Sequence, residues 1–342
     1  MNARLVGRTA GLVLLAWLAA PIHAETTGQQ RALAAGRGLV GSPAPRMVLK
    51  TIDGETIDLG ALYGKKAVYL KFWATWCTPC RQQMPHFEHT YETAGPDLAV
   101  IAVNTGFNDS VEQIRRFRKE LGITMPIVLD DGSLAAAFNL RVTPQHIVIG
   151  RDGHIEYVGH LADEQLNEAL VTARRAGPSK AKRSDGVARA DAPHYAVGDR
   201  LPATTVQTLD GRRLALGDTS TAHSTVLVFL SPWCESYLAT TRPSIAAGCR
   251  DAREQVAAAA QGSHARWLGV ASGLWAAPDD LQQYQQEHKI HIPLTLDESG
   301  VLFRAFRVNQ VPTVVIADGS GRITRRIDSG DSQTLHDALS GL

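Results

Sequence analysis

The stretch FWATWCTPC, residues 72–80, decides how the rest of the chain is interpreted. It ends an apolar and aromatic run at residues 67–73, which is typical of a buried strand, and Cys77 opens the helix predicted from there to about residue 91. A thiolate on Cys77 would face the unpaired backbone N–H groups and the positive end of that helix, which lower its pKa. Pro79 fits this position, because the first helical turn has no intrahelical donor to lose.

Cys80 lies one helical turn after Cys77, close enough to attack a mixed disulfide formed on it. A structural disulfide is the alternative, but in the chain-entropy model so short a loop stabilises by only about 1.9 kcal/mol, against about 3 kcal/mol for fifteen residues. Zinc is a second alternative, but no further Cys-x-x-Cys or Cys/His pair completes a tetrahedral ligand set. We therefore predict a redox-active dithiol and no bound metal. This role requires that a substrate can reach the Cys77 sulfur.

The region around this motif alternates predicted strands with predicted helices and ends in a hairpin. Such an order predicts an α/β sandwich built around a mixed sheet. The strands are expected at residues 47–52, 55–59, 67–73, 98–103, 126–129, 146–149 and 155–158, and the helices at residues 77–91, 111–121, 133–140 and 164–174.

The second half of the chain repeats the first. Phe72, Trp76 and Cys77 recur 157 residues later as Phe229, Trp233 and Cys234, and the opening Val-Gly, Pro and Asp-Gly signals keep the same offset. A fixed offset over so many positions indicates two copies of one domain. Between the copies, residues 177–194 are polar, charged and rich in Pro and Gly, which is typical of a linker. We predict domains at residues 39–176 and 195–342.

The WCTPC motif, its strand–helix setting and the later Thr143-Pro144 resemble the thioredoxin superfamily. The resemblance is to its TlpA-like branch, which comprises exported thiol–disulfide oxidoreductases. It implies two thioredoxin-like domains, each a central mixed β-sheet flanked by helices. The further residues that carry the resemblance are Val40-Gly41, Pro45, Asp53-Gly54, Arg81 and Pro85.

The resemblance also implies roles for individual residues. Cys77 would attack a substrate disulfide and Cys80 would resolve the mixed disulfide. Trp76, Thr143 and Pro144 would bind the substrate, with the backbone of Thr143 holding the substrate chain beside a cis Pro144. The implied substrates are protein disulfides, the implied electron donor is a membrane thiol protein, and no bound cofactor is needed.

Two positions depart from the family pattern. TlpA-like proteins often carry a glutamate where this chain has Gln83, and thioredoxin carries a buried aspartate where this chain has Lys71. Neither usual proton acceptor is therefore present. We hypothesise that Lys71 helps to hold Cys77 ionised, since a nearby cation favours the thiolate. The alternative is that Lys71 extends to the surface and has no such role.

The second copy keeps Cys234 at the attacking position, but Tyr237 stands where the resolving cysteine would be. Pro312 keeps the proline of the cis-proline pattern. Three interpretations stay open: a scaffold or binding platform, a one-cysteine active site, or a disulfide from Cys234 to Cys249. One continuous helix would place these cysteines about 22 Å apart, so the disulfide requires a break, which Pro243 can provide.

The beginning of the chain resembles an export signal. Arg4 and Arg8 precede an apolar run and a small-residue end, which predicts a signal peptide over residues 1–24. The run is too short to span a bilayer, although an uncleaved anchor remains the alternative. We expect a periplasmic protein without a membrane span after cleavage, because disulfides persist in oxidising compartments.

Composition narrows the function further. Apolar residues make up 44% of the chain, which supports packed cores, and 35 basic against 34 acidic residues give no general attraction to nucleic acid.

We predict a thiol–disulfide oxidoreductase that reduces protein disulfides. The alternatives are an oxidase that inserts disulfides and a redox-linked protein whose second domain captures a partner.

Overall fold

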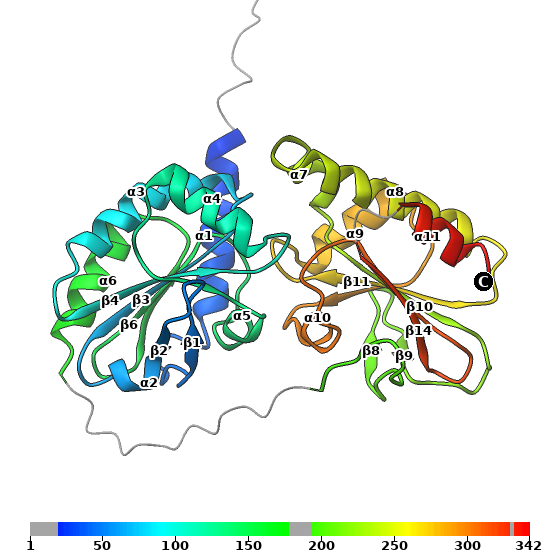
Figure 1. Ribbon diagram of the computed structural model, residues 1–342, viewed down its shortest axis with the longest axis horizontal. Coiled ribbons are helices and arrows are strands. Elements are labelled where there is room, and N and C mark those ends of the chain that lie inside the picture. Colours follow the sequence, from blue (N-terminus) through cyan, green and yellow to red (C-terminus); the bar gives the residue numbers. More distant parts are fainter. Residues whose placement is uncertain (1–19, 178–192, 329–331) are drawn as a thin grey trace, which may run out of the picture.

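The computed structural model describes residues 20–177, 193–328 and 332–342 (Figure 1). Of the predicted signal peptide, residues 1–19 lie outside this part, and residues 20–24 begin a helix, α1 (Ala20–Gly36), that the sequence analysis did not predict. The predicted linker lies outside the described residues except for its ends. Within the described ranges, no helix has both the length and the apolar character of a membrane span.

The first domain is built on a five-stranded sheet in the order β5-β4-β3-β6-β7. Strands β3, β4 and β5 run parallel, whereas β6 and β7 are antiparallel to their neighbours, so the predicted mixed sheet is confirmed. The predicted first hairpin forms a separate pair, β1-β2. The elements after α1 are β1 (Val48–Lys50), β2 (Thr56–Asp58), α2 (Leu59–Leu62), β3 (Ala67–Trp73), α3 (Thr78–Glu92), β4 (Leu98–Asn104), α4 (Val111–Leu121), β5 (Ile127–Leu129), α5 (Ser133–Ala137), β6 (Gln145–Ile149), β7 (Ile155–Gly159) and α6 (Glu164–Arg175).

The second domain repeats this topology with the strand order β12-β11-β10-β13-β14 and a separate pair β8-β9. The fold is therefore two thioredoxin-like α/β domains, as the sequence predicted. Its elements are β8 (Thr205–Gln207), β9 (Arg213–Ala215), β10 (Thr225–Leu230), α7 (Cys234–Thr241), α8 (Pro243–Ala260), β11 (Arg266–Ser272), α9 (Pro278–Glu287), β12 (Leu294–Asp297), α10 (Val301–Ala305), β13 (Thr313–Ala317), β14 (Ile323–Asp328) and α11 (Ser332–Leu339).

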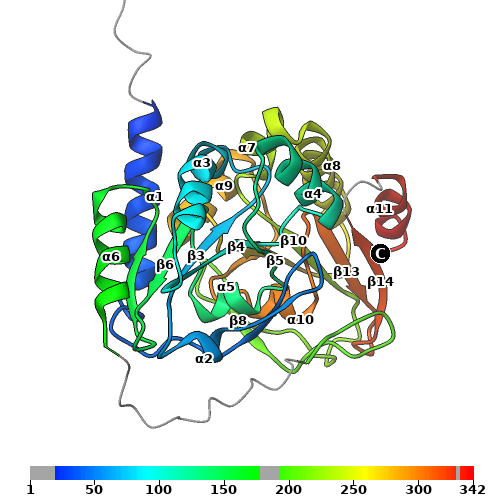
Figure 2. The ribbon, with the colours of Figure 1, turned by 60° about the vertical axis from the view of Figure 1, so that its left-hand side comes forward.

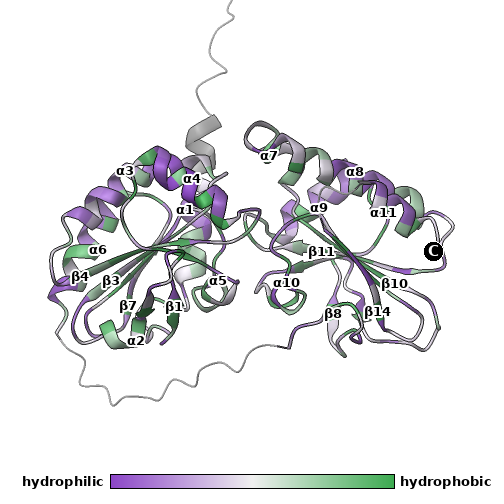
Figure 3. Ribbon diagram, viewed as in Figure 1, coloured by the Kyte–Doolittle hydropathy of each residue, from purple (hydrophilic) through white to green (hydrophobic). Residues whose placement is uncertain are grey.

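Each sheet is covered on both faces, so its central strand is mostly apolar, with Lys71 in β3 and Thr225 in β10 as the polar exceptions. In the first domain α3 and α4 cover one face while α5 and the β1-β2 pair lie on the other, and in the second domain α8 and α10 take the corresponding places (Figures 1 and 2). Figure 3 shows the strands mostly hydrophobic and the outer helices more hydrophilic. Seven consecutive residues of β3 are buried, which makes this strand a rigid support for the motif that follows it.

The two domains differ at the helix that follows the first cysteine. In the first domain α3 is continuous, although Pro85 lies within it. In the second domain the helix breaks at Arg242-Pro243 into α7 and α8, the break that a Cys234–Cys249 disulfide requires. Proline starts α8 because its fixed φ and missing N–H suit the first helical turn.

Candidate functional site

The dithiol lies where β3 ends and α3 begins. Cys77 is the N-cap residue of α3, and its Sγ accepts a hydrogen bond from the backbone N–H of Cys80 at 3.2 Å. The two sulfurs form a disulfide with an Sγ–Sγ distance of 2.03 Å. The helix N-terminus therefore supplies backbone donors to Cys77, which is the environment that favours a thiolate after reduction.

The loop before β6 completes the site from the other side. The Thr143–Pro144 peptide bond is cis, as the resemblance implies, and the Cys77 Sγ lies 3.4 Å from the carbonyl oxygen of Thr143. The carbonyl of Pro144 accepts a hydrogen bond from Nδ1 of His160 at 2.7 Å. The loop is thus fixed by a neighbouring strand end and presents its backbone next to the dithiol.

Lys71 lies in the middle of β3 and is fully buried. Its Nζ has no hydrogen-bond partner and lies 5.3 Å from the centre of the Phe87 ring. The alternative that Lys71 extends to the surface is therefore wrong. Burial lowers the pKa of Lys71 to about 7, so a large share of this amine is neutral at physiological pH. That loss of charge limits the electrostatic support that Lys71 can give to a thiolate.

A buried hydrogen-bonded group adjoins α3 and was missed by the sequence analysis. Nε2 of His146 lies 2.9 Å from Oε1 of Gln83 and 3.1 Å from the carbonyl oxygen of His160. Both of these oxygens can only accept a hydrogen bond. Nε2 therefore carries the proton, and Nδ1 accepts from the Tyr69 hydroxyl at 2.8 Å. Burial lowers the pKa of His146, which agrees with a neutral ring. Gln83 positions His146 here, since an amide does not take up the proton that a glutamate would.

The second domain covers the dithiol. Cys77 and Trp76 are each only 1% exposed. The Trp76 and Trp233 rings pack with centroids 5.0 Å apart, and the N–H of Thr78 donates to the Tyr237 hydroxyl at 3.2 Å. The residue in the place of the missing resolving cysteine thus contacts the N-terminus of α3. The requirement that a substrate can reach Cys77 is not met in this arrangement.

The contact between the domains has approximate twofold symmetry. The N–H of Asn108 donates to the carbonyl of Asn309, three residues before Pro312, at 2.7 Å. In the reverse direction, the N–H of Trp275 donates to the carbonyl of Arg141, three residues before Pro144, at 2.8 Å. The same face is therefore used by both domains, as in an isologous dimer interface. We call it the paired face.

Side chains reinforce the paired face near the substrate loop. Nε1 of Trp275 donates to Oγ1 of Thr143 at 3.2 Å, and Arg141 pairs with Glu298 at 3.2 Å. Arg242 lies 3.7 Å from the buried carboxylate of Asp109. Two of the residues predicted to bind substrate, Trp76 and Thr143, therefore contact the second domain instead.

The second domain carries no free thiol. Cys234 and Cys249 form a disulfide, with Cα atoms 6.3 Å apart, that links α7 to α8. Cys234 is fully buried, so in this structure it does not form the one-cysteine active site that the sequence left open. The Val311–Pro312 bond is cis, like its counterpart in the first domain. The second domain thus keeps the geometry of the site but none of its exchangeable thiols.

Comparisons with known proteins agree with this geometry. The AhpC/TSA family model matches residues 40–158. The thioredoxin-like protein YneN of Bacillus subtilis is 38% identical over 133 residues, which cover 38% of this chain and 78% of YneN. The thiol-disulfide oxidoreductase ResA of Halalkalibacterium halodurans is 36% identical over 134 residues, which cover 38% of this chain and 74% of ResA.

Solved structures are similar over a comparable length. The crystal structure of StoA from Bacillus subtilis is 31% identical and matches 37% of this chain and 97% of StoA, with a TM-score of 0.33. The family assignment rests on these relatives and on the Cys77–Cys80 pair at the helix N-terminus. The chain belongs to the thioredoxin-like family of thiol–disulfide oxidoreductases that includes ResA.

Proposed function

We propose that the first domain reduces disulfides of exported proteins in the periplasm. The observation that carries this proposal is the Cys77–Cys80 pair, with Cys77 at the helix N-terminus and next to the Thr143 carbonyl. The predicted signal peptide supports the location, as does the Cys234–Cys249 disulfide outside the dithiol motif, since such disulfides persist in oxidising compartments. The relatives named thiol-disulfide oxidoreductases support the reaction class.

The reaction is an exchange of two electrons. In the reduced protein, the Cys77 thiolate attacks one sulfur of a substrate disulfide and expels the other as a thiolate, which takes up a proton. Cys80 then loses its proton and attacks Cys77, which releases the second substrate thiol and leaves the Cys77–Cys80 disulfide. A membrane thiol protein, the donor that the resemblance implies, would return the two electrons. In these steps Thr143 and Pro144 would align the substrate chain beside Cys77.

The buried position of Cys77 sets a condition on this function. With Trp76 and Thr143 in contact with Trp233 and Trp275, no substrate chain can lie beside the dithiol. We therefore propose that the protein acts when the paired face separates. The contacts there are hydrogen bonds, ion pairs, ring contacts and apolar residues that belong to one buried cluster spanning both domains, so separation has to expose apolar surface.

Insulin reduction by the full-length protein tests the proposal. With an excess of a small dithiol as electron source, we expect turnover in the natural protein and at least about 100-fold less in Cys77→Ser. The matched control is Cys234→Ser combined with Cys249→Ser, which should retain turnover. Turnover that survives in Cys77→Ser would overturn the assignment. Turnover lost in the control as well would favour a redox-linked protein in which the second domain has the main role.

A further inference from the structure

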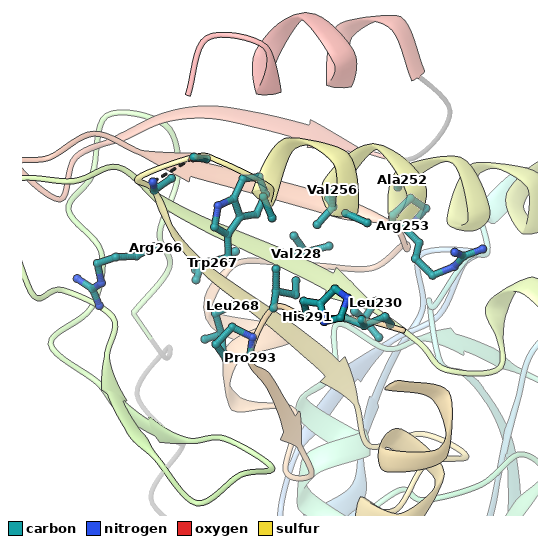
Figure 4. A pocket seen from close by; sticks show the side chains of 18 of the residues that line it. Val228, Leu230, Ala252, Arg253, Val256, Arg266, Trp267, Leu268, His291 and Pro293 are labelled. Atoms are coloured by element: carbon teal, nitrogen blue, oxygen red, sulfur yellow. Dashed lines mark hydrogen bonds between the residues drawn. The ribbon is translucent and has the colours of Figure 1, made fainter. Parts of the chain in front are cut away.

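A cavity of about 420 Å³ lies in the second domain, between α8 and the sheet (Figure 4). Its walls come from α8, from strands β10 and β11, and from the turn before β12. Its volume falls within the range of about 300–1,000 Å³ that is usual for small-molecule sites. The side chains that define it are Val228, Leu230, Ala252, Val256, Trp267 and Ile292.

The cavity has a cause in the sequence. At the positions 157 residues earlier, the first domain carries Lys71 and Trp73 where the second carries Val228 and Leu230. In the first domain this layer is filled, because Lys71 packs on the Phe87 ring and Trp73 is fully buried. The second domain has smaller side chains on the same face of the same strand, so space remains under its helix.

Two hydrogen-bond donors in the cavity wall have no partner. They are Nε1 of Trp267 and Oγ of Ser231, and both residues are more than nine-tenths buried. An unsatisfied buried polar group costs about 1–3 kcal/mol, which a ligand with an acceptor atom would recover. The cavity is therefore apolar in its walls but supplies donors at fixed positions, the usual composition of a ligand site.

The charged side chains around the cavity already have partners. Of the described residues that line it, none is acidic, whereas Arg253, Arg266 and His291 are basic. Arg253 is paired with Glu235 at 2.8 Å, and Arg266 bonds backbone carbonyls, so neither needs the ligand as a partner. In Figure 4 the two arginines lie at opposite ends of the cavity, and the Arg266 side chain extends away from the Trp267 ring. The Trp267 N–H is therefore the donor that an acceptor oxygen of a ligand would meet in this part of the cavity.

We propose that this cavity binds an apolar molecule with an oxygen-bearing head group, whose chain or ring fills the space under α8 and whose oxygen accepts a hydrogen bond from Trp267. The site is separate from the Cys77–Cys80 dithiol. Cys249 lines it, so the ligand would lie beside the second disulfide.

Decanoate is the probe, and the indole N–H resonances of the full-length protein are the readout. The Trp267 resonance is assigned by its loss in Trp267→Phe. We expect decanoate to move it, and decyltrimethylammonium, which has the same chain but no acceptor oxygen, to leave it in place. Trp73 is an internal control, because its Nε1 also lacks a partner but its surroundings are filled. Equal shifts with both probes, or no shift with decanoate, would overturn the proposal.

Filling the cavity provides the second test. Val256→Trp, or the smaller change Ala252→Leu, should weaken decanoate binding about tenfold or more, while insulin reduction stays unchanged. Unchanged circular dichroism shows that the second domain of the variant is folded. Unchanged decanoate binding in a folded variant would place the ligand elsewhere and contradict the proposal. Loss of insulin reduction in Cys77→Ser does not bear on this site, so the two proposals fail independently.

Discussion

The two domains share a strand order, a cis proline and a tryptophan before the first cysteine, yet only the first has an exchangeable dithiol. Three residues after that cysteine, Cys80 in one domain corresponds to Tyr237 in the other. The second cysteine of the second domain, Cys249, lies across a helix break and forms a bond that staples two helices. The comparison teaches that this fold alone does not determine the activity of a domain. A few positions around the start of one helix decide whether the domain carries an exchangeable dithiol.

The domains also differ in what lies under that helix. The first domain buries Lys71 and the hydrogen-bonded His146, whereas the second has Val228 and a cavity. The two domains contact each other through the paired face, where the Tyr237 hydroxyl bonds the N-terminus of α3. The missing resolving cysteine is thus replaced by a residue with a defined contact to the active domain.

The largest expected effect concerns the chemistry itself. In a Cys77→Ser background, Tyr237→Cys rebuilds a Cys-x-x-Cys sequence in the second domain. We expect it to restore less than about one hundredth of the insulin reduction, because Cys234 is buried and already bonded to Cys249. Recovery of substantial turnover would show that sequence spacing alone, without the helix geometry of the first domain, makes the active site.

The second prediction concerns Lys71 and its counterpart Val228. Burial has lowered the pKa of Lys71 from 10.5 to about 7, so the unfolded chain binds more protons between these values and stability rises with pH there. Lys71→Met should therefore raise the free energy of unfolding of the oxidised protein, by up to about 5 kcal/mol at or below pH 7, where the cost of burying the charge is full. The gain should shrink as the pH rises toward 10.

Urea unfolding at several pH values, with fluorescence as the readout, measures that gain. A gain that is constant with pH would mean that Lys71 is not buried as a titrating amine. Thiolate absorbance of the reduced Lys71→Met protein tests the separate hypothesis that Lys71 helps to ionise Cys77. An unchanged pKa of Cys77 would refute that hypothesis.

The third prediction compares the two disulfides. Closing the loop from Cys234 to Cys249 should stabilise by about 3 kcal/mol, and closing the loop from Cys77 to Cys80 by about 1.9 kcal/mol, in the chain-entropy model. Replacing Cys234 and Cys249 with serines should therefore lower stability more than replacing Cys77 and Cys80 with serines. Thermal unfolding of the two double-serine variants measures the order, and the reverse order would reject a stapling role for Cys234–Cys249.

The smallest expected effect concerns the paired face. Tyr237→Phe removes the acceptor of the Thr78 N–H, a net loss of about 1 kcal/mol, so the open state should become about fivefold more populated. Alkylation of Cys77 in the reduced protein should speed up by the same factor. Thr324→Val is the control, because it removes a hydroxyl of the same domain that bonds the Ile316 carbonyl between β13 and β14. Equal rates in both variants and the natural protein would mean that Tyr237 does not hold the domains together.

Local signals in the sequence predicted the parts of the site that are local in the chain. The strand before Cys77, the helix start after it and the two proline loops all follow from short motifs. The burial of Lys71 could not be predicted, since a lysine in a strand can place its amine in solvent or, as here, under a helix. The His146–Gln83 bond and the Trp76–Trp233 contact join residues 63 and 157 positions apart, for which no local pattern exists.

The equilibrium potential of the Cys77/Cys80 couple, measured in glutathione buffers, tests the central claim most directly. The Cys234→Ser, Cys249→Ser variant isolates this couple from the second disulfide. A protein-disulfide reductase requires a low value, and we predict one near that of thioredoxin, about −270 mV. A value near that of a strong dithiol oxidase, about −120 mV, would contradict the reductive direction and make the first domain a source of disulfides instead.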